Sequence, residues 1–214
     1  MSDFSTRRVM MVDTQVRPSD VTKFPIIEAM LSVPREAYVP AAKREAAYVG
    51  ENLDLGGRVL IEARTLSKTL DALDILPSDH VLVIGCGQGY STAVIARMAR
   101  SVVGVEEVAD LAAAASATLA AQGVGNATVQ AGPLVAGAQG SFDVILIEGG
   151  VEEVPEALLS QLAEGGRIAA IFMQGALGIV KIGHKSDGRT SWRFGFNATA
   201  PVLNGFATAK AFAL

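Results

Sequence analysis

The residues of this chain best suited to bind a ligand are three glycines at alternate positions, Gly85, Gly87 and Gly89. They directly follow the apolar run 81–84, and a continuous Val/Ile/Leu run is typical of a strand buried on both faces. Glycines after such a strand let the backbone turn sharply and approach a ligand with no Cβ in the way. A strand, a bare loop and a helix together predict a nucleotide-type binding site.

The spacing of the glycines indicates which nucleotide is bound. A dinucleotide loop has the pattern G-x-G-x-x-G, but here the third glycine comes one position early and Tyr90 stands in its place. The tighter G-x-G-x-G form suits a ligand without a pyrophosphate, such as S-adenosylmethionine. Glu106 ends the next predicted strand, where a carboxylate can accept hydrogen bonds from both ribose hydroxyls. The predicted cofactor-binding residues are therefore Gly85, Gly87, Gly89, Tyr90 and Glu106, and the alternative is a glycine-rich turn that serves packing alone.

The elements that would position this loop alternate along the chain. Predicted strands at 80–84, 101–105, 127–130, 142–147 and 167–172 are separated by predicted helices at 91–99, 111–122 and 155–162. Such alternation favours a parallel sheet with helices on both faces. The turn Asp187-Gly188 then predicts an antiparallel hairpin of 177–184 with 190–196. The predicted class is α/β, with a mostly parallel sheet and a C-terminal antiparallel hairpin.

Residues 1–78 are predicted to form helices joined by proline-containing turns, one of them an amphipathic helix over 65–76. No repeat, linker or low-complexity tract divides the chain. We therefore predict a single domain over 1–214, with a helical N-terminal extension (1–78) and an α/β core (79–214).

Composition narrows the class of protein. The net charge is −4 and no run of basic residues exceeds two, which argues against a nucleic-acid partner. The N-terminus lacks the apolar segment of a secretory signal, and no apolar stretch reaches the roughly 20 residues that span a bilayer. The single cysteine, Cys86, excludes an internal disulfide. These features predict a cytoplasmic protein that binds neither nucleic acid nor membrane; they give no indication of its oligomeric state.

The chain resembles protein-L-isoaspartate O-methyltransferases over nearly its whole length. The most specific segment is Val-Pro-Arg-Glu-Ala-Tyr-Val-Pro at 33–40; others lie at 11–17, 47–48, 81–90, 142–143, 155–158 and 162–168. The resemblance implies a Rossmann-like methyltransferase sheet with an N-terminal helical extension. It also implies S-adenosylmethionine as cofactor, and as substrate a damaged protein or peptide whose isoaspartyl carboxylate is methylated. The ester then collapses to a succinimide, and hydrolysis restores some normal aspartate.

Two motifs depart from the family pattern. Ile61-Glu62-Ala63 stands where the family has Ser-Gln-Pro, whose serine lies near the transferred methyl, so the catalytic residues stay unassigned. Gly132-Pro133-Leu134 stands where the family has Gly-Asp-Gly, and proline offers the adenine side neither a side-chain acceptor nor an N–H. A second hypothesis is therefore a family member that has lost isoaspartyl repair. It would methylate another acceptor or act as a non-catalytic cofactor-binding or interaction protein.

Other candidate residues point less clearly to chemistry. Cys86 is interpreted as a small residue in a tight turn, the alternative being a catalytic thiol at a helix start. The two histidines, His80 and His184, lack the spacing of metal ligands, so no metal site is predicted. Glu148, at the end of a predicted strand, either faces the ligand pocket or is a solvated loop residue. Trp192, Phe194 and Phe196 alternate in the last predicted strand and are interpreted as a core stripe.

Overall fold

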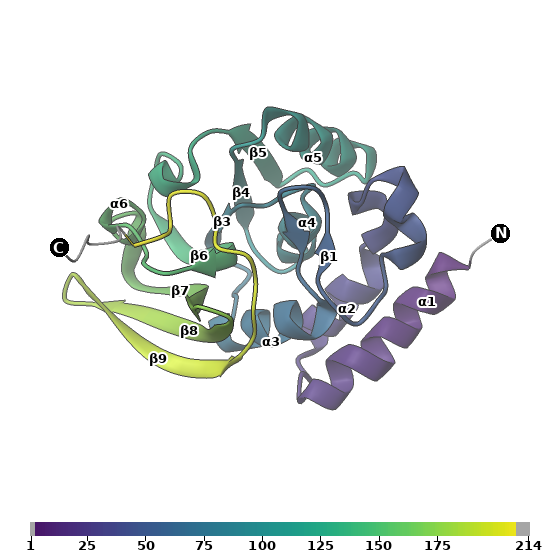
Figure 1. Ribbon diagram of the computed structural model, residues 1–214, viewed down its shortest axis with the longest axis horizontal. Helices are drawn as coiled ribbons and strands as arrows, with labels where there is room; N and C mark the ends of the chain where they lie inside the picture. The colour runs from purple at the N-terminus through teal and green to yellow at the C-terminus, as the bar shows by residue number, and fades with distance from the viewer. Residues whose placement is uncertain (1–2, 209–214) are drawn as a thin grey trace.

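The apolar run 81–84 forms the greater part of an interior strand of a seven-stranded sheet in the computed structural model, which describes residues 3–208. The strand order is β5-β4-β3-β6-β7-β8-β9 (Figure 1). The strands from β5 to β7 pair in parallel, while β8 and β9 are antiparallel to their neighbours. Their bounds are β3 His80–Ile84, β4 Ser101–Glu106, β5 Ala127–Ala131, β6 Phe142–Val151, β7 Leu162–Gln174, β8 Leu177–Ser186 and β9 Arg189–Asn197. The predicted α/β class, with its mostly parallel sheet and C-terminal antiparallel hairpin, is confirmed.

The two faces of the sheet contribute to two apolar clusters. In β3, Val81 and Val83 belong to the cluster beneath the N-terminal helices, whereas Leu82 and Ile84 point to the opposite face. That opposite face is closed by short elements and by Leu203 and Phe206 of the segment after β9. Because the strand is apolar at consecutive positions, both of its faces are buried, as expected for the middle of a parallel sheet.

The helices that follow the strands are α4 (Tyr90–Ala96), α5 (Ala109–Ala121) and α6 (Glu156–Leu159), with a 3₁₀ turn η5 (Leu134–Ala136). The helix predicted over 155–162 is much shorter, because β7 already begins at Leu162. Among residues 3–208, no helix combines the length and apolar character required to cross a bilayer.

The N-terminal region is largely helical and lies beside the sheet (Figure 1). Its helices are α1 (Phe4–Met11), η1 (Val12–Val16), η2 (Arg17–Ser19), α2 (Phe24–Ser32), η3 (Arg35–Tyr38), η4 (Ala41–Ala46) and α3 (Ala63–Leu73). The prediction of helices throughout 1–78 was wrong between η4 and α3. There β1 (Leu53–Asp54) and β2 (Val59–Leu60) form a small antiparallel hairpin. Its turn contains Gly56 and Gly57, both at positive φ, and such residues favour a turn over a helix. The single-domain organisation stays a prediction.

The last strand corrects the predicted aromatic stripe. Trp192 and Phe196 pack against opposite clusters, and Phe194 is 62% exposed. The register with β8 shifts between Val180 and Lys181, so that Gly195 is bulged out of the ladder. A one-residue bulge moves side chains to the other face, which breaks the alternation that the sequence suggests.

The buried centre of β3 predicts a large effect on stability. Leu82→Ala removes a side chain with no exposed surface and should lower the free energy of unfolding by about 2–5 kcal/mol. The matched control Leu177→Ala, at a leucine that is 77% exposed, should change it by less than about 0.5 kcal/mol. Urea denaturation followed by circular dichroism measures both. Equal effects of the two substitutions would contradict the assignment of β3 to the core.

Candidate functional site

The loop after β3 turns at three glycines that all adopt positive φ, 75° at Gly85, 54° at Gly87 and 88° at Gly89. A Cβ on Gly89 would lie 3.3 Å from the Cβ of Ala115, so this glycine lets α5 approach closely. A Cβ on Gly87 would meet only the Cβ of Arg58, at 4.0 Å. Gly87 is therefore the position where the bare backbone leaves open space.

Glu106 ends the neighbouring strand β4, and its carboxylate meets this loop. Oε2 accepts the N–H of Gly87 at 2.9 Å, and Oε1 accepts the N–H of Val108 at 3.0 Å. The side chain has no exposed surface. The structure thus brings together the glycine loop and the carboxylate that the sequence paired 19 positions apart.

Arg58 is the residue of this site that sequence reasoning missed. It comes from the β1–β2 hairpin and binds Glu106 with two hydrogen bonds, Nε to Oε2 at 3.0 Å and Nη2 to Oε1 at 2.9 Å. Nη2 also donates to Oε1 of Glu107 at 2.7 Å. Burial alone would lower the pKa of the guanidinium, but the hydrogen bonds to both carboxylates outweigh it and raise that pKa. A lone arginine 48 residues away gives no signal of this partnership in the sequence.

Tyr90 lies at the start of α4, but its ring points into the core. The ring packs edge-on against Tyr38 at 5.9 Å and under the guanidinium of Arg35 at 4.7 Å. Only 1% of Tyr90 is exposed. Any contact between this residue and a ligand at the loop must therefore come from its backbone.

Glu148 lies at the carboxyl end of β6 and is buried rather than solvated. Ser91 Oγ donates a hydrogen bond to its Oε2. Burial raises the pKa of Glu148 to about 8, although this hydrogen bond and the charge of Arg35 act in the opposite direction. The residue lines a cavity of about 130 Å³ together with Arg58, Gly149 and Leu203, so it is not a solvated loop residue; that this cavity belongs to the ligand site stays a prediction.

Ile61 and Pro133, which the sequence analysis interprets as departures from the family pattern, flank these groups. Ile61 is buried, its carbonyl oxygen accepts from Arg35 Nη2 at 2.7 Å, and it shares a second, much smaller cavity with Glu148. Pro133 precedes η5, next to Gly132, whose N–H donates to the carbonyl oxygen of Glu106 at 3.0 Å. Ile61 and Pro133 thus lie on either side of the loop, near Glu148 and Glu106 respectively.

Cys86 fills space in the turn. A Cβ on Gly104 of β4 would lie 2.9 Å from its Sγ, so the thiol packs tightly against that strand. Burial raises the pKa of the thiol far above its ordinary value, which keeps it protonated and unreactive. The part of the chain that the structure describes contains no cluster of metal-ligating side chains.

Comparison with known proteins identifies the family. A profile described as protein-L-isoaspartate(D-aspartate) O-methyltransferase matches residues 8–195. The chain belongs to this family. It is 36% identical over 171 residues to a protein-L-isoaspartate O-methyltransferase of Koribacter versatilis, covering 78% of this chain and 77% of the relative. It is 34% identical over 212 residues to one of Methylorubrum extorquens, covering 97% and 92%.

Solved structures agree in fold. A protein-L-isoaspartate O-methyltransferase superposes with a TM-score of 0.81 at 22% identity, covering 94% of this chain and 66% of that one. A Plasmodium falciparum protein assigned to the same family, solved with S-adenosyl-L-homocysteine, gives 0.80 at 18% identity, covering 95% and 99%. The fold of the protein-L-isoaspartate O-methyltransferase family is therefore present almost throughout the chain.

The chemical groups at the loop are of the types that the family's cofactor, S-adenosylmethionine, requires. The ribose hydroxyls of such a cofactor suit a carboxylate at the end of the strand that follows the loop strand, and Glu106 is a carboxylate in that position. Gly87 leaves open backbone beside it. The feature that does not suit the ligand is Arg58, which takes the same carboxylate oxygens.

The buried carboxyl of Glu148 predicts a pH-dependent stability. Its ordinary pKa is 4.5 and its pKa in the folded protein is about 8, so the folded state holds this proton more tightly than the unfolded chain. The resulting stabilisation is complete below pH 4.5 and is lost as pH rises through 8. The free energy of unfolding of the wild type, minus that of Glu148→Gln, should therefore fall across this window.

Urea denaturation at several pH values measures this difference. The control Glu153→Gln makes the same chemical change at an exposed position. A difference for Glu148→Gln that does not change with pH would show that Glu148 is ionised in the folded protein at neutral pH.

Proposed function

We propose that this protein is an S-adenosylmethionine-dependent methyltransferase that esterifies the isoaspartyl carboxylate of damaged proteins. The observation that carries the proposal is the hydrogen bond from Gly87 N–H to Glu106, which joins the glycine loop and the acid at one edge of the sheet. In a chain of this family, that pairing is the expected seat of the adenosyl group. Gly85, Gly87, Gly89, the backbone of Tyr90 and Glu106 would hold the cofactor.

The strand order indicates how the cofactor would be oriented along the edge of the sheet. Strands β4, β3 and β6 are neighbours, and their carboxyl ends share one edge. A ligand whose ribose is bound at Glu106 on β4 and which crosses the loop after β3 reaches the end of β6, where Glu148 lies. We therefore assign the ribose to the Glu106 side and the acceptor to the Glu148 side.

Methyl transfer to a carboxylate acceptor requires few catalytic groups from the protein. When bound, the cofactor supplies a methyl group on a cationic sulfur, which an acceptor oxygen displaces in line. An ionised carboxylate is already a nucleophile, so no general base is required and positioning supplies much of the rate. Ile61 offers such an acceptor no hydrogen bond. Protonated Glu148 has a proton to donate, and within the described residues no group bonds its Oε1.

A groove suited to the substrate lies beside Ile61. It has a volume of about 690 Å³ and is lined by the neighbouring Glu62, by Asn52 and Arg64, and by Leu177 and Asn197 of the final hairpin. Leu177 is 77% exposed. The volume is within the range of ligand-binding clefts, roughly 300–1,000 Å³, and we propose that the damaged segment of the substrate protein lies here. We also propose a cytoplasmic location, since the only cysteine is a buried free thiol.

The proposed reaction is tested in two steps. Calorimetric titration with S-adenosyl-L-homocysteine should show one binding site. Transfer of radiolabelled methyl from the cofactor should then be faster to an isoaspartyl peptide than to the same peptide with normal aspartate. Binding without transfer to the isoaspartyl peptide would exclude the repair reaction. Equal transfer to both peptides would exclude the proposed specificity.

The role of the loop is tested by matched glycine substitutions. Gly87→Ala places a methyl group where the cofactor's ribose must approach, and should weaken S-adenosyl-L-homocysteine binding about tenfold or more. Gly123→Ala is the control, because Gly123 also has positive φ and open surroundings but lies after α5. The two variants should lose similar stability on thermal unfolding. Unchanged affinity in Gly87→Ala would remove this loop from the cofactor site.

A further inference from the structure

We propose that Arg58 is a latch on the cofactor site: it occupies the ribose-binding oxygens of Glu106, and the cofactor binds only when the β1–β2 hairpin releases them. This inference rests on the proposed function, because it takes Glu106 as the ribose ligand. It makes Arg58 the residue that sets cofactor affinity.

The first argument is saturation of the carboxylate. Oε2 of Glu106 accepts from Gly87 N and Arg58 Nε, and Oε1 accepts from Val108 N and Arg58 Nη2. A carboxylate oxygen has about two lone-pair sites, so all four sites are used. The guanidinium binds in the fork geometry that a pair of ribose hydroxyls would otherwise use. Ribose and Arg58 therefore exclude one another at Glu106.

The second argument is volume. The cavity bounded by Arg58, Glu148, Gly149 and Leu203 measures about 130 Å³, whereas sites for ligands of this size have volumes of roughly 300–1,000 Å³. Arg58 is itself one wall of the cavity, and its side chain is only 6% exposed. Moving it would enlarge the space on the Glu106 side.

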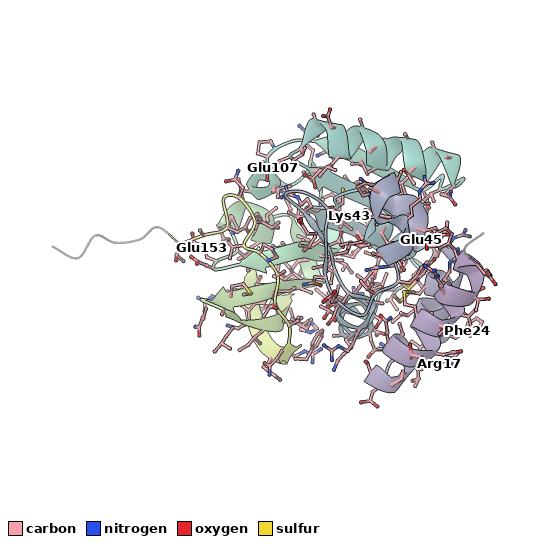
Figure 2. The ribbon with its side chains drawn as sticks, turned by 45° about the vertical axis from the view of Figure 1, so that its right-hand side comes forward. Arg17, Phe24, Lys43, Glu45, Glu107 and Glu153 are labelled. Atoms are coloured by element: carbon pink, nitrogen blue, oxygen red, sulfur yellow. The ribbon has the colours of Figure 1, made fainter. Side chains whose placement is uncertain are left out.

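The segment after β9 supports the closed arrangement. It returns over the carboxyl ends of the strands, where Val202 pairs with Gly150 of β6 (yellow in Figure 1). A Cβ on Gly85 would lie 3.3 Å from Leu203 Cδ1, so this leucine covers the first turn of the loop. Asn204, which belongs to this segment, donates from Nδ2 to Oε2 of Glu107 at 3.0 Å. Glu107 is labelled in Figure 2. Glu107 thus joins this segment to Arg58.

The hairpin has a hinge beside the latch. Gly56 and Gly57 precede Arg58 with φ of 80° and 94°, and a Cβ on either would meet no atom within 4 Å. Both glycines are exposed, so no packed side chain hinders a change of the backbone angles there.

Two substitutions open the latch in different ways. Arg58→Ala removes the competing guanidinium. Glu107→Gln leaves Glu106 and the loop intact but neutralises the second carboxylate that holds Arg58. A closed fraction weakens the apparent affinity by the reciprocal of the open fraction. The dissociation constant for S-adenosyl-L-homocysteine should therefore fall about tenfold in Arg58→Ala and by a smaller factor in Glu107→Gln.

The control is Arg17→Ala, which removes an arginine from an ion pair with Asp13 where 53% of the Arg17 side chain is exposed, and which should bind as the wild type does. Calorimetry measures the affinities, and circular dichroism confirms that each variant is folded; should Arg58→Ala not fold, Glu107→Gln decides. Equal affinity in the wild type and the opened variants would overturn the latch while leaving the proposed function standing. Weaker binding in Arg58→Ala would overturn it by making Arg58 a ligand of the cofactor. No binding in any variant would overturn the proposed function itself.

Discussion

The buried carboxylate of Glu106 is the constraint on which the functional edge of the sheet depends. A carboxylate without solvent contact is costly unless every oxygen is hydrogen-bonded and its charge is paired. Glu106 meets this requirement with donors from three parts of the chain: the loop after β3, the entry to α5, and the β1–β2 hairpin. The hydrogen bonds to the Glu106 carboxylate therefore hold these three segments at the end of β4. The same oxygens are the ones a ribose would use, so the structural requirement and the proposed binding role compete.

A second buried charge, Arg35, joins the N-terminal helices to this edge. Arg35 Nε donates to the carbonyl of Ala47 at 2.7 Å and Nη2 to that of Ile61, while the guanidinium packs on the ring of Tyr90. Burial lowers the pKa of this arginine, against the attraction of Tyr90 and Glu148. The Val-Pro-Arg-Glu segment that marks the family in the sequence is thus a structural connector. It sets the path of the chain that carries Ile61 and, through Tyr90, the start of α4.

On the proposed acceptor side, two buried residues replace the serine that the sequence resemblance leads us to expect. Ile61 stands at the expected serine position, and a buried acid, Glu148, lies near the end of β6. Both line one small cavity. Because burial raises the pKa of Glu148 to about 8, its carboxyl would supply a hydrogen-bond donor close to the position where the serine is expected.

The features that could be predicted from the sequence were those encoded by neighbouring residues. Each of these features is encoded by a stretch of about ten residues or fewer, and each lies where expected. They are the apolar run of β3, the alternate glycines after it, Glu106 at the end of β4 and the Asp187-Gly188 turn. Phe196 packs on the face opposite Trp192 because of a bulge at Gly195, and a bulge depends on how β9 pairs with β8, which periodicity alone does not specify. The β1–β2 hairpin was missed because its strands are only two residues long.

The sequence by itself thus determined the family, the parallel sheet and the pairing of a bare loop with an acid, because local pattern and spacing specify strands and turns. Only the tertiary structure decided what that acid holds. Arg58 reaches Glu106 across 48 residues through a hairpin, and Leu203 reaches the glycine loop from beyond the last strand. Such contacts arise from how separate segments fill one space and satisfy one buried charge.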